Sequence, residues 1–423
     1  MERIYLDNNA TTQPAPQVLD VMNEAEQKWW ANPSSVHRFG QSVRHRLELA
    51  RASVARLIGA QDNQIIFTSG GTESNNLALR GMLGSHPGKR PREQGQPNVL
   101  VTTKVEHSAI REPAEALAES DVEVIYLPLD DHARIHPCEL RKVLGDCAVD
   151  RARVLVSIQW ANNETGVIQP MSEIAAVCRE NLGHGKSLWL HTDATQAVGK
   201  IPVDVGQVPV DLLTLSAHKF HGPKGVGTLY VRRPTRLQPL IRGGPQEREK
   251  RGGTENSIAI IGAGTAAELA AEFLNMPGEL ERLRILRDRF EQSICQAETA
   301  GENPGVGVGV GVVNPPGVAA EGSVGDEHRI WNTTNIGFAR LEAEAILMGL
   351  SERGVCASAG AACSSGSLEP SPVLLAMGIP ESVAHGSIRL SLSRFSTQRE
   401  LDQAARIVSE VVKKLAQTMT MSV

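Results

Sequence analysis

Short apolar segments that alternate with longer amphipathic segments are the feature of this sequence that most restricts its fold. The apolar segments are rich in Val, Ile and Leu, and polar or glycine-containing stretches follow them. Near-continuous apolar strands separated by helices predict a mainly parallel sheet that helices cover on both faces. The expected strands are residues 65–68, 98–102, 123–127, 154–158, 187–191, 212–216 and 227–231. The pattern therefore predicts an α/β fold.

An alanine-rich helix is expected to mark the passage to a second domain. Amphipathic segments 72–81, 110–119 and 171–181 alternate with the strands, an alanine-rich segment follows at 258–273, and charged amphipathic segments lie at 278–298 and 401–418. Segment 301–328 alternates Gly and Val and contains two consecutive prolines. Because Gly weakens strands and Pro stops them, we favour a surface insertion there over a glycine-interrupted strand.

The composition is that of a globular protein and argues against several other classes. Hydrophobic residues make up 41% of 423 residues, and the net charge is −5. A mildly acidic chain has no general affinity for nucleic acid or anionic membranes. No apolar run reaches the roughly 18 residues of a membrane span, and no signal peptide is evident. Six cysteines are too few for a disulfide framework. We expect a cytoplasmic protein with no direct nucleic-acid or membrane partner.

A metal site is not expected. His132, His136 and Cys138 have a tolerable ligand spacing, but no second cysteine or histidine pair completes a set of four ligands. The sequence also contains no CxxC motif.

Two residues that follow expected strands carry the first chemical signal. Asp193 follows segment 187–191, and Lys219 follows segment 212–216 and precedes a glycine-rich turn. A lysine and a carboxylate on separate strand ends suit pyridoxal phosphate, because the lysine binds its aldehyde as a Schiff base and the carboxylate keeps its ring nitrogen protonated. A structural salt bridge is the alternative, and these two residues alone leave it open.

Three more polar loops follow expected strands. Gly71 and Thr72 open a helix, where backbone N–H groups can bind phosphate, although a plain helix cap is the alternative. His107 suits stacking on a flat cofactor, or is an ordinary loop histidine. Asn163 lies in a polar loop after segment 154–158. Because ligands bind at the carboxyl ends of parallel strands, five such loops favour a ligand site.

A run of small residues contains a candidate nucleophile. All residues of 356–367 are small, so this segment buries little apolar surface and is expected to be a mobile loop. An accessible thiol there is suited to nucleophilic attack, which we expect for Cys363. Cys356 directly follows an apolar segment and is expected to be a buried structural cysteine. Further on, Arg389 lies on an expected strand and can bind a substrate carboxylate; a surface ion pair is the alternative, and Arg394 competes for the role.

Taken together, these segments resemble the cysteine desulfurases of iron–sulfur cluster assembly and nitrogen fixation, which are class-V aminotransferases. The matching stretches run in family order from residue 5 to 395 and include YLDNNATT (5–12), FTSGGTESNNLAL (67–79), HTDATQAVGK (191–200), SAHKFHGPKGVGTLYV (216–231) and SIRLSLSRF (387–395). The resemblance implies fold type I of the pyridoxal-phosphate enzymes, with a large domain built on a mainly parallel seven-stranded sheet and a smaller α+β domain. The large domain would span 16–257, and the small domain would combine 1–15 with 258–423 and carry the cysteine loop 356–367.

The resemblance also implies a role for each candidate residue. Lys219 would bind the cofactor, Asp193 would pair with its ring nitrogen, His107 would stack on the ring, and Gln196, with Asn163 nearby, would contact the ring hydroxyl. The phosphate would be held by Gly71, Thr72, Ser216 and His218. In a homodimer, Thr254 would reach the phosphate of the partner subunit.

The implied activity converts L-cysteine to L-alanine and leaves a persulfide on Cys363. Arg389 and Asn163 would bind the substrate, and His107 would move a proton near its sulfur. The sulfur would pass to an acceptor protein such as an iron–sulfur cluster scaffold. Small departures from the family are Gly71 and Ala361, where Ala and Ser are usual, and a long segment 301–328.

Other readings of the same residues stay open. An aminotransferase, a carbon–sulfur lyase or a selenocysteine lyase on the same scaffold would not depend on Cys363. A non-catalytic sulfur-relay scaffold would keep the loop cysteine but have no use for Asp193 and Lys219.

Overall fold

The larger of the sheets has seven strands in the order β2-β8-β7-β6-β5-β3-β4. The computed structural model describes residues 3–84, 98–120, 122–130, 132–146, 153–181, 187–299, 310–312, 328–359 and 369–420. The strands are β2 (Ile65–Thr68), β3 (Asn98–Thr102), β4 (Val122–Tyr126), β5 (Arg153–Ser157), β6 (Ser187–Asp193), β7 (Leu212–Ser216) and β8 (Gly227–Val231). β8 runs antiparallel to both of its neighbours, and the other pairs are parallel. The predicted α/β fold is therefore confirmed.

Both faces of this sheet are buried, as the apolar strands predict. Val154 and Val156 of β5 belong to one core, and Leu155 between them belongs to another. Helices α1 (Pro16–Lys28), α2 (Arg38–Leu57), α6 (Met171–Glu180) and α8 (Ser257–Leu274) contribute to the first core, and α3 (Gly71–Leu83) and α4 (Ser108–Ala118) to the second. Two further helices of this part are α5 (Pro137–Asp146) and the short α7 (Gln246–Glu249).

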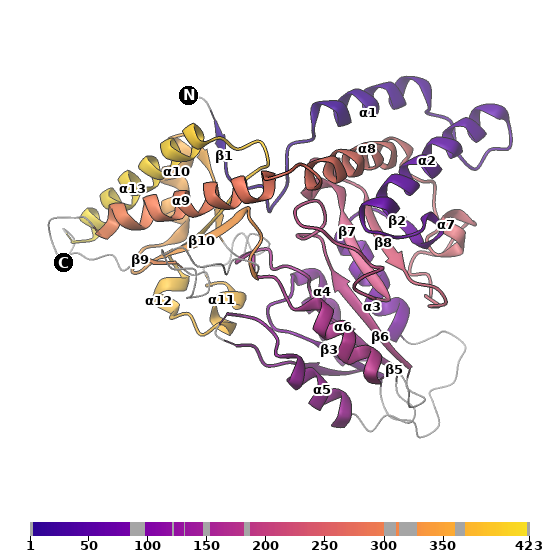
Figure 1. The fold of residues 1–423 in the computed structure, drawn as a ribbon, viewed down its shortest axis with the longest axis horizontal. Helices are drawn as coiled ribbons and strands as arrows, with labels where there is room; N and C mark the ends of the chain where they lie inside the picture. Colours follow the sequence, from indigo (N-terminus) through magenta and orange to yellow (C-terminus); the bar gives the residue numbers. More distant parts are fainter. Residues whose placement is uncertain are drawn as a thin grey trace.

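Helix α8 is long and apolar enough to cross a membrane by length and composition alone. More than half of it is buried, and the helix packs against α1 and α2 (Figure 1). We therefore interpret α8 as a core helix. Its residues as far as Ala270 belong to the core of the large sheet, whereas Phe273 belongs to the next core. The predicted domain boundary at 257/258 falls at the start of this helix.

The rest of the described chain, which we call the small-sheet part, is built on two smaller sheets and the helices that pack on them. One sheet has the order β12-β13-β10-β9, and β1 (Ile4–Tyr5) pairs with β11 (Val355–Cys356). The other bounds are β9 (Val310–Val312), β10 (Thr333–Phe338), β12 (Ser358–Ala359), β13 (Ser387–Ser391), α9 (Glu279–Thr299), α10 (Ala343–Glu352), α11 (Pro372–Ala376), α12 (Glu381–Ala384) and α13 (Gln398–Thr420). Figure 1 shows that the N-terminal strand lies beside the C-terminal helices before the chain crosses to α1.

Two details differ from expectation. Val310–Val312 forms a strand that pairs with β10, so this part of the Gly/Val segment adopts the strand alternative; 301–309 and 313–327 lie outside the described residues. Cys356 is half-buried and ends strand β11. Cys363 and the rest of 360–368 lie outside the described residues.

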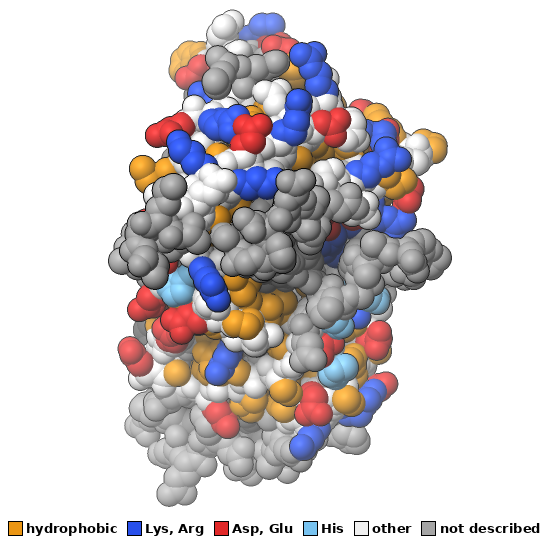
Figure 2. Space-filling view, turned by 90° about the vertical axis from the view of Figure 1, so that its left-hand side faces the viewer, with side chains coloured by type: hydrophobic (Ala, Val, Ile, Leu, Met, Phe, Trp, Pro, Cys, Tyr) orange, Lys and Arg blue, Asp and Glu red, His pale blue; other side chains and the backbone are white. Residues whose placement is uncertain are grey.

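Charged side chains of both signs are interspersed on the face shown in Figure 2. This mixture agrees with the small net charge of −5. Among the described residues, no group of three or more His, Cys, Asp or Glu side chains is placed to hold a metal ion.

Candidate active site

A cavity of about 220 Å³ lies at the carboxyl ends of strands in the large sheet. Nine of the twelve candidate residues line it: Gly71, Thr72, His107, Asn163, Asp193, Gln196, Ser216, His218 and Lys219. Asn75, Ala109, Gln159, Ala161 and Thr195 complete the lining. The strand-end loops of the sequence therefore meet around one space.

Asp193 is the last residue of β6 and is 8% exposed. One carboxylate oxygen, Oδ2, accepts a hydrogen bond from Asn75 Nδ2 at 2.7 Å. The other, Oδ1, accepts from the backbone N–H of Thr195 at 3.0 Å. Two donors hold the carboxylate in a fixed orientation at the cavity wall, where it can stabilise a cationic N–H of a ligand.

Lys219 ends the 3₁₀ turn η3 (Ala217–Lys219), which directly follows β7. Its Nζ donates to the carbonyls of Asn9 at 2.5 Å and Ala10 at 2.9 Å. The N-terminal segment therefore approaches the lysine from the other side of the cavity. Lys219 lines the cavity, and a lysine amine can form a Schiff base with an aldehyde.

The first turn of α3 provides an anion-binding wall. Because the first N–H groups of a helix have no partner within the helix, they attract anions, and Gly71 and Thr72 begin α3. The buried Oγ1 of Thr195 has no hydrogen-bond partner among the described atoms. A Cβ added at Gly71 would meet this oxygen at 3.4 Å, an ordinary contact, so the alanine usual in the family would fit. An unpaired hydroxyl beside a helix N-terminus fits a phosphate group.

His107 and His218 both line the cavity. His107 caps α4, and its Nδ1 accepts from the Ala109 N–H at 3.0 Å, so the proton of the neutral ring is on Nε2. Burial and the neighbouring Lys219 lower the pKa of His218 to about 4. His218 is therefore neutral at physiological pH. Its Nδ1 lies 3.1 Å from Thr11 Oγ1.

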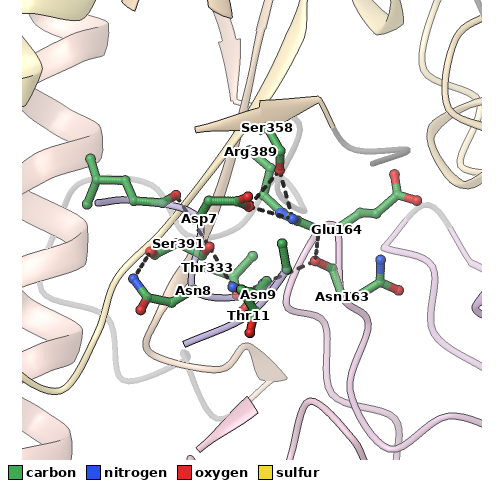
Figure 3. Close-up of polar contacts among 12 residues, drawn as sticks. Asp7, Asn8, Asn9, Thr11, Asn163, Glu164, Thr333, Ser358, Arg389 and Ser391 are labelled. Carbon is green, nitrogen blue, oxygen red and sulfur yellow. Dashed lines mark hydrogen bonds and ion pairs between the residues drawn. The ribbon is translucent and has the colours of Figure 1, made fainter. Parts of the chain in front are cut away.

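Arg389 lies on β13 and is only 2% exposed. Figure 3 shows its guanidinium beside Asp7 and Ser358. Its Nη2 donates to Asp7 Oδ1 at 2.9 Å and to Ser358 Oγ at 2.7 Å, and its Nη1 donates to the carbonyl of Asn163 at 3.0 Å. Its Nε has no partner among the described atoms. Asn163 lines the cavity, so only this one residue separates the Arg389 guanidinium from the cavity. The Arg389 Nε is a further donor that can bind a ligand. Arg394 instead donates to the Leu269 carbonyl.

Two candidates lie elsewhere. Thr254 is exposed and is not part of the cavity lining. Cys363 lies outside the described residues. The roles of all twelve residues remain predictions.

Some lining residues were not expected. Asn75 lies one helical turn after Thr72, so the i, i+3 spacing could have indicated it. Thr195 and Gln159 each lie two residues after a strand end, that of β6 and β5 respectively. Asn9 contacts Lys219 through its carbonyl, but 210 residues separate the two, and no local pattern indicates that contact.

The fold and the cavity together define an α/β enzyme of the aminotransferase type. The sequence profile of the family described as "Aminotransferase class-V" matches residues 4–299. A cysteine desulfurase of Trichormus variabilis is 43% identical over 98% of this chain and 94% of its own length. A solved NifS-like protein has a TM-score of 0.83 and 32% identity over 98% of this chain and 100% of its own. Another structure, SspA in complex with cysteine, has a TM-score of 0.73 and 29% identity, covering 93% and 99% of the two chains.

The chain belongs to the class-V aminotransferase family and, within it, to the cysteine desulfurases.

Proposed function

We propose that this protein is a pyridoxal-phosphate-dependent cysteine desulfurase. The observation that carries the proposal is that the Lys219 amine and the Asp193 carboxylate line one cavity with the N-terminus of α3. Lys219 would bind the cofactor aldehyde and Asp193 its ring nitrogen. Thr72, Thr195, Ser216 and His218 would surround its phosphate. When bound, the cofactor supplies a protonated ring that accepts the electron pair released at the substrate Cα.

In the proposed reaction, the sulfur of L-cysteine passes to the thiol of Cys363. The substrate Cβ–S bond breaks, an S–S bond forms, and the products are L-alanine and a persulfide on Cys363. Cysteine and one protein thiol contain all the atoms of these products, so no external oxidant or reductant is needed. The attack needs a thiolate, which is the nucleophilic form of cysteine.

The remaining residues would bind the substrate and move its protons. Arg389 would hold the substrate carboxylate through the Nε that has no described partner. Lys219 would carry the proton that leaves the Cα. His107, with its proton on Nε2, would move a proton near the substrate sulfur.

The test measures alanine and sulfide release from L-cysteine under reductant. Wild type and Cys138→Ser, which changes an exposed cysteine, are expected to release both products. Cys363→Ser is expected to keep the yellow cofactor and lose release. Lys219→Ala is expected to lose the yellow colour and turnover together.

Each alternative gives a different result. If Cys363→Ser releases sulfide at the wild-type rate, the protein is a lyase that needs no loop cysteine. A colourless wild type would favour a sulfur-relay scaffold. A yellow wild type that releases nothing would indicate another amino-acid substrate or a missing activator.

We also propose that the protein is a homodimer in the cytoplasm and passes its sulfur to an acceptor such as an iron–sulfur cluster scaffold. Leu240 and Ile241 are 41% and 40% exposed, and the Ile241 carbonyl accepts from the Gly252 N–H at 2.9 Å. The exposed apolar pair therefore lies next to the loop between α7 and α8 that carries Thr254, which supports a subunit contact there. A thiol as acceptor supports a reducing compartment.

A further inference from the structure

Lys200 is a buried lysine beside the cavity that the proposed reaction does not use. It ends the HTDATQAVGK stretch and is 4% exposed. Gly199 has a φ of +77°, and a Cβ there would meet Phe220 Cβ at 2.5 Å, so glycine is required for the turn before Lys200. The indole of Trp331 donates to the Lys200 carbonyl at 2.7 Å. The backbone is thus fixed with its side chain directed inward.

The Lys200 amine has two neutral partners. Its Nζ donates to Gln196 Oε1 at 2.5 Å and to Asn9 Oδ1 at 2.8 Å. The charged groups that face it are Lys219, from the turn after β7, and Arg389, from β13. Burial and these two cations lower the pKa of Lys200 well below its ordinary value. Either protonation state of the amine has enough hydrogens for both acceptors.

The hydrogen-bond partners of Gln196 determine which of its polar atoms can face the cavity. Because the amide nitrogen of Gln196 faces the Asn9 carbonyl, its oxygen Oε1 faces Lys200 and accepts a hydrogen bond from that amine. The amide nitrogen donates one hydrogen to the Asn9 carbonyl at 3.0 Å. The second N–H remains, and Gln196 lines the cavity. In this orientation Gln196 presents a donor.

The side-chain amide of Asn9, the second partner of Lys200, is held in one orientation. Asn9 Oδ1 also accepts from Asn332 Nδ2 at 2.9 Å, and Asn9 Nδ2 donates to Thr333 Oγ1 at 2.8 Å. A flipped Asn9 amide would oppose donor to donor at Asn332, and acceptor to acceptor at the Asn163 carbonyl, which accepts from Asn9 Nδ2 at 3.1 Å. The amine of Lys200 therefore has a fixed anchor and can in turn fix Gln196.

We propose that Lys200 is a positioning residue that holds the Gln196 amide so that an N–H, and not the carbonyl oxygen, faces the ring oxygen of the cofactor. This inference rests on the proposed binding of pyridoxal phosphate. An N–H donor stabilises an anionic ring oxygen, and a carbonyl oxygen would repel it.

The experiment compares cofactor binding in wild type, Lys200→Met, Gln196→Ala and the double variant, with Lys28→Met as an exposed control. Apoprotein is titrated with pyridoxal phosphate, and the pH midpoint of the visible absorption of the bound cofactor is recorded. Lys200→Met is expected to weaken binding about tenfold, the scale of one hydrogen bond to a charged group. It is expected to raise the midpoint by about one pH unit.

The double variant separates positioning from a direct charge effect. If Lys200 acts through Gln196, adding Lys200→Met to Gln196→Ala changes neither readout further. An equal shift in both backgrounds would overturn the proposal. So would a folded Lys200→Met protein with wild-type binding and midpoint.

Gln196→Glu provides a test that keeps Lys200. A carboxylate there pairs with Lys200 and presents an oxygen to the cavity, so the midpoint is expected to rise. A wild-type midpoint in this variant would contradict the proposal. Wild-type protein that binds no pyridoxal phosphate would refute the proposed function, and this inference with it.

Discussion

Glu106 is a fully buried carboxyl group directly before His107. Its two oxygens accept from the backbone N–H of Gln159 at 2.9 and 3.1 Å, and Oε1 accepts from Thr103 Oγ1 at 2.9 Å. Burial raises its pKa from 4.5 to about 8, and the nearby Asp193 adds to the increase. Glu106 thus links the loop that carries His107 to the end of β5, in a largely protonated state at neutral pH.

Replacing Glu106 with Gln is expected to reduce the pH dependence of stability. Between pH 4.5 and 8 the folded protein holds the Glu106 proton and the unfolded chain loses it, so this group makes stability fall as pH rises. Gln196 and the other cavity residues are unchanged, and Gln mimics the protonated acid. Urea unfolding from pH 5 to 8 measures the difference.

The exposed Glu119 provides the control for this prediction. Glu119→Gln is expected to keep the wild-type slope of stability against pH. If Glu106→Gln shows the same slope as Glu119→Gln, Glu106 is ionised in the folded protein and the prediction is wrong.

Arg389 gives a prediction on substrate binding. Arg389→Lys loses the planar set of donors that can hold a carboxylate while still contacting Asp7. The KM for L-cysteine is expected to rise about 10- to 100-fold, the scale of one or two charge-assisted hydrogen bonds. Steady-state kinetics measures this change, with cofactor affinity as the control. A wild-type KM would remove Arg389 from the substrate site.

Residues of the site that follow strands could be predicted from sequence, and their partners could not. Asp193 and Lys219 each end or follow an apolar strand, and parallel strands bring such ends together. Asn75 contacts Asp193 across 118 residues, and Lys200 contacts Asn9 across 191. Hydrogen bonds of this kind depend on tertiary packing, which no local pattern encodes.

At the scale of elements, α2 and α8 pack closely through a glycine. A Cβ on Gly264 of α8 would lie 2.6 Å from Ala50 Cα and 2.7 Å from Ala50 Cβ of α2. Both atoms are held by their helix, so neither can move away cheaply. The small residues of α8 thus permit this close approach.

Gly264→Ala is therefore expected to lower stability by about 1 to 3 kcal/mol, the usual cost of overpacking. Gly145 is the matched control, because it also lies in a helix and a Cβ there meets no described atom within 4 Å. Gly145→Ala is expected to be neutral or to stabilise by up to about 1 kcal/mol through helix propensity. Urea unfolding of both variants measures the change in stability. If both variants are stabilised equally, α2 and α8 can move apart at little cost and the prediction for Gly264 is wrong.

The strands of the large sheet were predicted within one or two residues, because most of them are short apolar runs that are buried on both faces. The short strand pairings of the small-sheet part have no such signal in the sequence. Tyr5 pairs with Cys356, and both belong to strands of two residues. Two residues are too few for any periodicity, so only the folded chain reveals their register.

At the scale of the whole molecule, the N-terminal segment connects the small-sheet part to the large sheet beside the cavity. The Ser391 N–H donates to the Leu6 carbonyl at 2.7 Å, and the Thr12 N–H donates to the His218 carbonyl at 2.9 Å. Within six residues the chain passes from β13 to the turn that carries Lys219. The positions of Arg389 and Lys219 are therefore coupled through one short segment.

Helix α7, which directly precedes the loop that carries Thr254, is also anchored to the large sheet. Glu247 accepts two hydrogen bonds from Arg51, each at 2.7 Å, and a third from the Phe67 N–H at 2.8 Å. A rigid anchor holds the loop in place while its exposed residues face outward. A second subunit would then meet a preformed surface that includes Ile241.

Ile241→Asp is expected to convert the proposed dimer to monomer, because a carboxylate would be buried at the contact. Met348 is more exposed, at 68% against 40%, and lies on α10, so Met348→Asp is the matched control and is expected to remain dimeric. Sedimentation velocity at several concentrations measures the assembly. The monomer is expected to bind pyridoxal phosphate more weakly, since Thr254 would no longer reach a second subunit's phosphate. A dimeric Ile241→Asp protein would place the subunit contact elsewhere, and a monomer with wild-type cofactor affinity would contradict the role of Thr254.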